Sequence, residues 1–261
     1  MRKGLPAAES SPVRTLTRGL EVLGLFDADR TELAQSEIAQ ALDLPLPTVH
    51  RLCGTLLQQG FLAREPGQRR LRLGPEILRL AGPLLAGLGA TEHARAILRE
   101  LADETGETAS LATLVGAEAI YLDCAPGAGM LASRAAIGLR VPAHCTALGK
   151  ALLAQLDPAQ ARAQVGPEPY PARTPATLTG WSVLGPALAE VRRTGVAVSR
   201  EEYEEGLVAV AVAVAAAAGG LPLAIDLCVP AVRGTDEMLA TAAKRLRDVA
   251  AELAAADGTG R

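Results

Sequence analysis

Aromatic side chains are nearly absent from this 261-residue chain, which holds one Trp, three Tyr and two Phe. Hydrophobic residues nevertheless make up 49% of it, which supports a folded core and excludes a disordered chain. With so few rings, that core must be assembled from Ala, Leu and Val. The length allows one large domain or two small ones.

Paired cysteines and long apolar runs are missing as well. The four cysteines, Cys53, Cys124, Cys145 and Cys228, lie far apart in the sequence. This spacing argues against a zinc ribbon or a disulfide framework and favours reduced thiols. The longest apolar run, residues 207–218, is shorter than the about 20 residues that cross a bilayer. Because charges also interrupt the N-terminal apolar stretch, we expect no signal peptide, no membrane partner and a cytoplasmic location.

An excess of basic charge is missing overall but present locally. The formal net charge is −3, which argues against a general nucleic-acid coat. Residues 1–80 hold 11 basic and 9 acidic residues, whereas the remainder holds 15 and 20. Residues 44–80 alone hold 6 basic and 2 acidic residues. One short basic stretch on an acidic protein is the kind of patch that faces phosphates.

Residues 14–75 carry the pattern of a winged helix-turn-helix. Apolar residues recur at helical spacing over residues 16–27, with Leu16 and Leu20 on the expected core side, and two shorter helices are expected over 36–42 and 47–59. Alternating runs on either side of a Pro-Gly turn, residues 61–64 and 69–73, predict a hairpin. The third helix is expected in a major groove and the hairpin arginines on phosphates. The expected DNA contacts are Thr48, His50, Arg51, Arg64, Arg69 and Arg70.

The rest of the chain predicts a linker and a second domain. A flexible arm is expected over residues 1–13 and a linker helix over 76–90, interrupted near Gly82 and Pro83. A domain over residues 91–257 begins with a helix over 93–105, followed by strands over 108–115 and 119–124. Alternating Val and Ala at 208–214, then a second run at 221–229, predict another hairpin. A last helix over 236–255 completes an α+β chain.

Three motifs in this second domain invite a catalytic interpretation. Gly149-Lys150 looks like the end of a phosphate-binding loop, but His144 and Ala151 stand where the pattern needs Gly and Ser or Thr. His144 and Cys145 suggest thiol catalysis, but adjacent residues of a strand point to opposite faces. The acidic run at residues 201–205 is more typical of a solvated face than of a reaction centre. We therefore expect no catalytic residue, no cofactor and no enzyme.

One alternative stays open. Asp226 and Cys228, together with Cys145 or Cys124, offer ligand types that suit zinc. An enzyme or a metal-sensing α/β domain fused to a DNA-binding head is therefore the alternative function, although the leading interpretation assigns no metal ligand.

Five motifs occur in order along the chain. They are residues 36–39 (SEIA) with 44–52 (LPLPTVHRL), residues 60–62 (GFL) leading to 71–74 (LRLG), residues 138–151 (GLRVPAHCTALGKA), residues 174–179 (TPATLT) and residues 195–206 (GVAVSREEYEEG). In this order and spacing they resemble the IclR family of transcription regulators over nearly the whole chain. The chain departs from the family pattern at Leu71, where relatives often have Tyr, and at Leu46-Pro47, which replaces a polar pair.

The resemblance implies a GAF-like effector domain, dimers or tetramers, and binding to promoter DNA that a small molecule controls. Asp226 and Cys228 stand where relatives often have small residues such as Ser. Because a carboxylate in a pocket is costly unless it is hydrogen-bonded, we expect an effector with hydroxyl or amino donors, or else a nearby cation such as Arg134. If Asp226 instead faces solvent, it plays no part in binding. The effector-binding positions that the resemblance implies are Leu131, Ala147, Leu148, Gly149, Ala209, Asp226 and Cys228.

Overall fold

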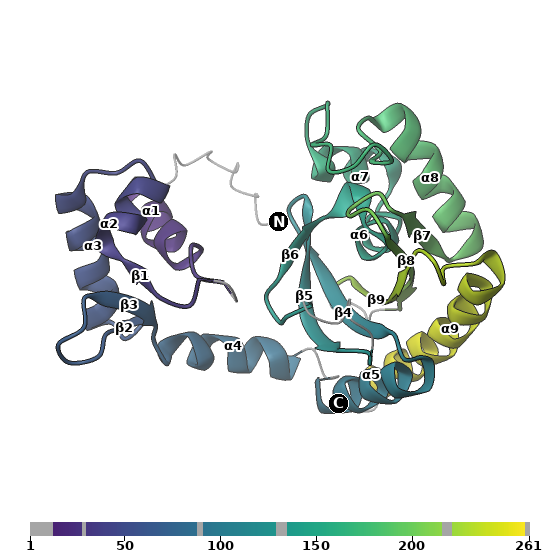
Figure 1. Ribbon diagram of the computed structural model, residues 1–261, viewed down its shortest axis with the longest axis horizontal. Helices are drawn as coiled ribbons and strands as arrows, with labels where there is room; N and C mark the ends of the chain where they lie inside the picture. The colour runs from purple at the N-terminus through teal and green to yellow at the C-terminus, as the bar shows by residue number, and fades with distance from the viewer. Residues whose placement is uncertain (1–12, 28–29, 88–90, 129–134, 216–220, 259–261) are drawn as a thin grey trace, which may run out of the picture. The chain divides into compact units, whose positions relative to one another are not determined.

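The computed structural model describes residues 13–27, 30–87, 91–128, 135–215 and 221–258. The chain divides into two compact units, Met1–Leu84 and Leu85–Arg261, and each has its own hydrophobic core (Figure 1). Apart from Val13, the expected arm lies outside the described residues, and so do residues 216–220, between the two runs of the expected hairpin. The expected linker helix corresponds to α4, Glu76–Gly87, but the expected interruption near Gly82 and Pro83 is wrong, because the helix continues through Pro83.

The first unit is a three-helix head with a small sheet. The helices α1 (Arg14–Leu23), α2 (Gln35–Ala41) and α3 (Leu46–Gln58) pack around buried Val22, Ile38 and Val49. Three short strands, β1 (Leu33–Ala34), β2 (Leu62–Ala63) and β3 (Arg70–Leu73), pair in the order β1-β3-β2. After α3 the chain reverses at Gly60, whose φ of +75° is a left-handed conformation that favours glycine. The winged helix-turn-helix architecture is confirmed.

The helix α1 differs from its expected form. It ends at Leu23 and does not continue to Asp27. Its Val22 is buried, but Leu16 and Leu20 remain 63% and 60% exposed. The core of this unit is small, so only one side of α1 finds partners within it. The prediction that Leu16 and Leu20 face the core is therefore wrong.

The second unit is built on one antiparallel sheet of six strands. Its strands are β4 (Thr108–Val115), β5 (Glu118–Ala125), β6 (Arg140–Pro142), β7 (Ala197–Arg200), β8 (Leu207–Val214) and β9 (Leu223–Pro230). They lie in the order β6-β5-β4-β9-β8-β7, so β4 and β9 are neighbours at the centre although they are far apart in the sequence. The α+β fold class is confirmed.

Helices cover the two faces of this sheet differently. One face carries Val and Leu side chains, such as Val210 and Leu227, and packs on α5 (Thr91–Thr105) and α9 (Asp236–Gly258). The other face carries smaller side chains, such as Ala209 and Ala224, and packs on α6 (Ala147–Leu153). Beyond it lie α7 (Pro158–Val165) and α8 (Trp181–Thr194), on the same side of the sheet as α6 in Figure 1. Since side chains alternate along a strand, every second residue of β4, β8 and β9 faces α6.

Candidate DNA-binding and effector-binding sites

The helix α3 presents one polar face. Pro47 lies in its first turn, where a missing N–H costs nothing, and Val49, Leu52 and Cys53 are buried. Thr48 is half-buried, whereas His50 and Arg51 are exposed. Within the described part of the chain, the Arg51 guanidinium has no hydrogen-bonding or ionic partner. This face is therefore free to contact an outside partner.

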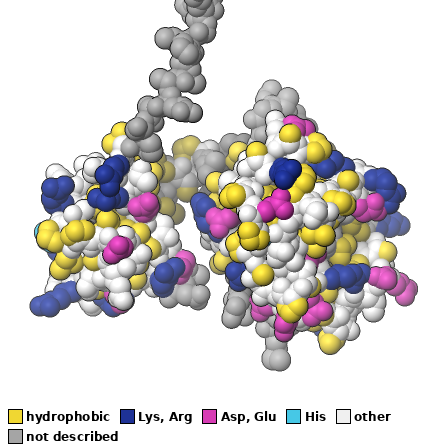
Figure 2. Space-filling model, turned by 90° about the horizontal axis from the view of Figure 1, so that it is seen from above, with side chains coloured by type: hydrophobic (Ala, Val, Ile, Leu, Met, Phe, Trp, Pro, Cys, Tyr) yellow, Lys and Arg dark blue, Asp and Glu magenta, His cyan; other side chains and the backbone are white. Residues whose placement is uncertain are grey.

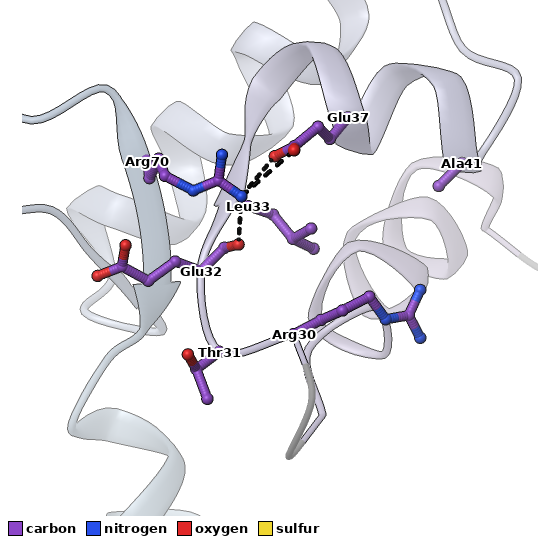
Figure 3. A pocket seen from close by; sticks show the side chains of 7 residues that line it. All are labelled: Arg30, Thr31, Glu32, Leu33, Glu37, Ala41 and Arg70. Atoms are coloured by element: carbon purple, nitrogen blue, oxygen red, sulfur yellow. Dashed lines mark hydrogen bonds and ion pairs between the residues drawn. The ribbon is translucent and has the colours of Figure 1, made fainter.

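The hairpin arginines fall into two groups. Arg64 and Arg69 are exposed and have no side-chain partner among the described residues. Arg70 extends toward α2, where its guanidinium lies 2.9 Å from a carboxylate oxygen of Glu37 and donates to the carbonyl of Glu32 at 2.8 Å (Figure 3). The Arg70 side chain thus joins the wing to the start of α2.

Glu37 has a second task at the same place. Its carboxylate accepts a hydrogen bond from the Ala34 N–H at 2.6 Å, which caps the start of α2. That hydrogen bond, together with the charge of Arg70, lowers the pKa of Glu37 below its ordinary value. The same residues line an open surface cleft in the first unit with Arg30, Thr31, Leu33 and Ala41 (Figure 3). Because Arg30, Glu37 and Arg70 are already paired within the protein, we assign no ligand to this cleft.

In the second unit, the expected effector residues gather on the sheet face that packs on α6. Ala147, Leu148 and Ala209 belong to one buried cluster, against which Cys228 is packed. Asp226 lies opposite Ser110 of β4 and Ala211 of β8 in the register, on the same face. Leu131 and Arg134 lie outside the described residues. The structure therefore brings Ala147, Leu148, Ala209, Asp226 and Cys228 to the face of the sheet that packs on α6.

Asp226 is 2% exposed and only partly satisfied. Its Oδ2 accepts a weak hydrogen bond from the Cys228 thiol at 3.5 Å, and its Oδ1 has no partner. The Ser110 hydroxyl, directly opposite, also has no partner. Burial raises the pKa of Asp226 to about 7, although the thiol of Cys228 and the hydroxyl and N–H of Ser110 oppose this shift. Asp226 therefore does not face solvent.

Other polar groups border the same place. Tyr121 on β5 is buried, and burial, reinforced by the charge of Asp226, raises its pKa well above the ordinary value. Cys124 lies opposite Ser110, and burial raises its pKa as well. Sequence reasoning missed Ser110 and Tyr121, and it named Cys124 only as a candidate zinc ligand. The alternation of side chains along each strand predicts the sheet face on which these residues lie, but only the pairing of β4 with β9 brings them to Asp226.

Gly149 is needed for close packing and does not offer a free amide. Its N–H donates to the Thr146 hydroxyl at 3.2 Å, which caps α6. A Cβ at this position would lie 2.2 Å from the Cα of Ala143, so only glycine fits. Its neighbour Lys150 is buried, and its Nζ lies 2.5 Å from Glu202 Oε1 and 2.6 Å from the Val198 carbonyl. The lysine therefore holds α6 to the segment after β7, which agrees with the rejection of a phosphate loop.

Two expectations about the rejected motifs are wrong in their details. His144 and Cys145 lie in a one-turn 3-10 helix, Ala143–Cys145, and not on a strand. His144 Nε2 lies 3.0 Å from the Pro171 carbonyl, and its ring lies against Tyr170. Burial lowers the pKa of His144 and raises the pKa of Cys145 to about 12, so this thiol stays protonated. The acidic run is not wholly solvated either, because Glu202 is buried against Lys150.

Neither a metal cluster nor a membrane helix occurs within the described residues. No group of three or more His, Cys, Asp or Glu side chains there is arranged to hold a metal ion. The four cysteines are free thiols. No described helix is long and apolar enough to cross a bilayer.

Comparisons with known proteins match both units of the chain. The IclR helix-turn-helix domain model matches residues 15–66, and the model of the bacterial transcriptional regulator IclR C-terminal domain matches residues 84–255. Among curated proteins, the chain is 32% identical to the HTH-type transcriptional regulator XynR of Escherichia coli, covering 94% of this chain and 98% of XynR. It is 35% identical to the probable transcriptional regulator SauR of Cupriavidus necator, covering 90% and 94%.

Solved structures lead to the same family. A putative IclR regulator from Silicibacter is 32% identical with a TM-score of 0.80, covering 94% of this chain and 96% of that one. An IclR homologue from Microbacterium hydrocarbonoxydans, solved with 4-hydroxybenzoate, is 25% identical with a TM-score of 0.80, covering 94% and 100%. With its helix-turn-helix domain and its C-terminal ligand-binding domain both matched, the chain belongs to the IclR family of DNA-binding transcriptional regulators.

Proposed function

We propose that this chain is a cytoplasmic homo-oligomer whose binding to operator DNA responds to a small effector held beside Asp226. It acts as a regulator and not as an enzyme. In this proposal Thr48, His50 and Arg51 contact base edges from α3, and Arg64 and Arg69 contact phosphates from the wing. Arg70 places the wing through Glu37.

The observation that carries the effector site is the unpartnered oxygen of Asp226. A buried carboxylate oxygen without a hydrogen bond is costly. Ser110 adds a second unpartnered oxygen from the neighbouring strand. A ligand hydroxyl or amine beside these residues would donate to Asp226, and a hydroxyl would also accept from Ser110. The neighbouring apolar residues Ala147, Leu148 and Ala209 suit an apolar remainder.

The ligand class follows from this chemistry. We infer a small molecule with at least one hydroxyl or amino donor and an apolar body. The 4-hydroxybenzoate bound by the Microbacterium homologue has both features. The matched pair 4-hydroxybenzoate and benzoate therefore probes the donor directly, and wider pairs of hydroxylated and plain acids extend the probe.

The effector test compares wild type with Asp226→Asn in a thermal-shift screen of such pairs, followed by gel shifts. In wild type, donor-bearing members should stabilise the protein more than their plain partners. Asp226→Asn should change the affinity for them about tenfold, the worth of about 1.4 kcal/mol for one charged hydrogen bond. DNA binding without effector should stay intact. An unchanged effector response in the variant would remove Asp226 from the site.

Two exposed apolar surfaces of the first unit support the oligomer. On α1, Val13, Leu16 and Leu20 are each at least 60% exposed. On α4, Leu78 is 74% and Leu80 53% exposed. Hydrophobic side chains are visible at the surface of this unit in Figure 2. A second copy would bury these faces and supply the second head that a near-palindromic site requires.

Signalling in this proposal is a shift of populations. The effector binds one arrangement of the second units more tightly than another, and α4 passes the difference to the spacing of the two heads. A ligand with equal affinity for both arrangements would change nothing.

A further inference from the structure

Leu46 is an apolar residue of α3 that does not pack in the hydrophobic core of the first unit. It is the first residue of the helix and is 52% exposed, whereas Val49 and Cys53 are fully buried. It belongs to none of the hydrophobic clusters, although its neighbours Leu42 and Leu44 pack against the core of the first unit. The fold of this unit therefore does not explain why a leucine stands here.

The position of Leu46 on α3 suggests what the side chain meets. It lies one turn before His50 on the same side of the helix, next to the polar face that includes Arg51. The N-terminal residues of a recognition helix are the ones that contact base edges. Pro47 has no N–H and adds no polar side chain, so the first turn of α3 brings an apolar surface to the DNA.

The major groove offers such a surface at only one kind of base. Guanine, adenine and cytosine present hydrogen-bonding atoms there, whereas thymine also presents its C5-methyl group. A leucine pressed against polar base edges would strip them of water and give no hydrogen bond in return. Packed on a methyl group, it buries apolar surface on both sides.

We propose that Leu46 is a specificity-determining residue that reads one thymine in each half-site through the C5-methyl group. The proposal rests on the placement of α3 in the major groove that the proposed function makes. It goes further, because it predicts that one base position is recognised by a methyl group and not by a hydrogen bond.

The test removes that methyl group from the DNA. Wild-type protein first selects a preferred duplex from a random pool, and each thymine of that duplex is then replaced by deoxyuridine, which lacks only the methyl. Fluorescence anisotropy measures the affinity of wild type, Leu46→Ala and Val183→Ala for every duplex. Val183 is a matched control because it is 50% exposed on α8, outside the head.

One replacement per half-site should weaken wild type and Val183→Ala about three- to fivefold, the effect of losing one buried methyl contact. The same replacement should leave Leu46→Ala unchanged, because the two changes remove one interaction. Leu46→Ala should also melt like wild type, since the side chain is exposed. The proposal is overturned if no replacement distinguishes wild type from Leu46→Ala, or if Leu46→Ala melts several degrees lower, which would mean that Leu46 packs within the protein.

The variant Arg51→Ala distinguishes a failure of the inference about Leu46 from a failure of the proposed function. If Arg51→Ala relaxes base preference while deoxyuridine has no differential effect, α3 reads the groove and only the methyl contact fails. If Arg51→Ala keeps the preference of wild type, the placement of α3 itself fails, and the inference about Leu46 fails with it.

Discussion

At the scale of single residues, the sequence alone does not show which residues partner the buried polar groups of the second unit. Glu202 sits in an acidic run that is typical of a solvated face, yet it pairs with Lys150, 52 residues away. Asp226 was expected in the effector pocket, with exposure to solvent as the alternative, and it is buried. The thiol of Cys228 and the hydroxyl of Ser110 beside it follow only from the folded register.

The raised pKa of Asp226 predicts how the stability of the empty protein depends on pH. Burial raises this pKa from 3.8 to about 7, so the folded chain holds a proton that the unfolded chain has lost in this interval. The stability that this proton supplies is fully present below about pH 4 and is lost as pH rises through 7. Within that window the free energy of unfolding should fall by up to about 1.4 kcal/mol per pH unit from this group.

Asp226→Asn should remove that slope. Urea unfolding of both proteins between pH 5 and pH 8 measures it: wild type should lose stability relative to Asp226→Asn up to about pH 7, and the difference should stay constant above that pH. Parallel profiles would mean that Asp226 is ionised and partnered throughout, which would contradict the unpartnered oxygen.

Arg69 and Arg70 are adjacent in the wing but should behave differently on DNA. Each phosphate neutralised contributes about 0.9 to the slope of log affinity against log salt. Arg69→Ala should therefore reduce the slope by about that amount, because its side chain has no partner among the described residues. Arg70→Ala should weaken binding with little change of slope, because Arg70 is held by Glu37 and Glu32.

Binding to a random duplex at four salt concentrations supplies both slopes. An equal loss of slope in Arg70→Ala and Arg69→Ala would show that Arg70 leaves Glu37 to contact phosphate, as the sequence alone suggested.

At the scale of helices and strands, local patterns predicted what local contacts determine. The spacing of Val49, Leu52 and Cys53 predicted the buried side of α3, and the Pro-Gly turn predicted the wing. The strands β4 and β9 were each expected, but their pairing was not, because it joins segments about a hundred residues apart in the chain. The helix α7 has a start signal that was overlooked: Asp157 accepts from two amides and Pro158 follows it.

Replacement of Gly54 in α3 by alanine should raise the stability of the protein but lower its affinity for DNA. It lies in the exposed middle of the helix, and a Cβ added there would meet nothing within 4 Å. Gly54→Ala should therefore stabilise the protein by about 1 kcal/mol, because alanine favours the helix. If the exposed face of α3 lies in the groove, the added methyl should crowd the DNA and weaken binding.

Melting curves and anisotropy on one preparation supply both readouts. A Gly54→Ala protein that is more stable and binds DNA as wild type does would place this part of α3 away from the duplex.

At the scale of the whole molecule, the apolar faces of α1 and α4 connect assembly with DNA binding. A monomeric head that exposes Leu16, Leu20 and Leu78 carries an apolar surface that water disfavours. One head also covers too little DNA for strong specificity, so both problems are solved by a second copy. We therefore expect wild type to be at least a dimer in solution and to bind two half-sites together.

A charge placed on that surface should separate the copies. Leu20→Glu leaves the core of the first unit unchanged, because Leu20 is 60% exposed. It would nonetheless bury an unpaired carboxylate in any interface formed there, which costs several kcal/mol. Light scattering should therefore report a smaller mass for Leu20→Glu. If only the heads separate, Leu20→Glu should instead bind the operator more weakly while its binding to a single half-site stays unchanged. Val183→Glu, a matched change on an exposed residue of α8, should alter neither measurement. The proposed assembly is refuted if wild type is monomeric at working concentration and still binds its operator tightly. If Leu20→Glu has the mass and operator affinity of wild type, the interface does not include α1.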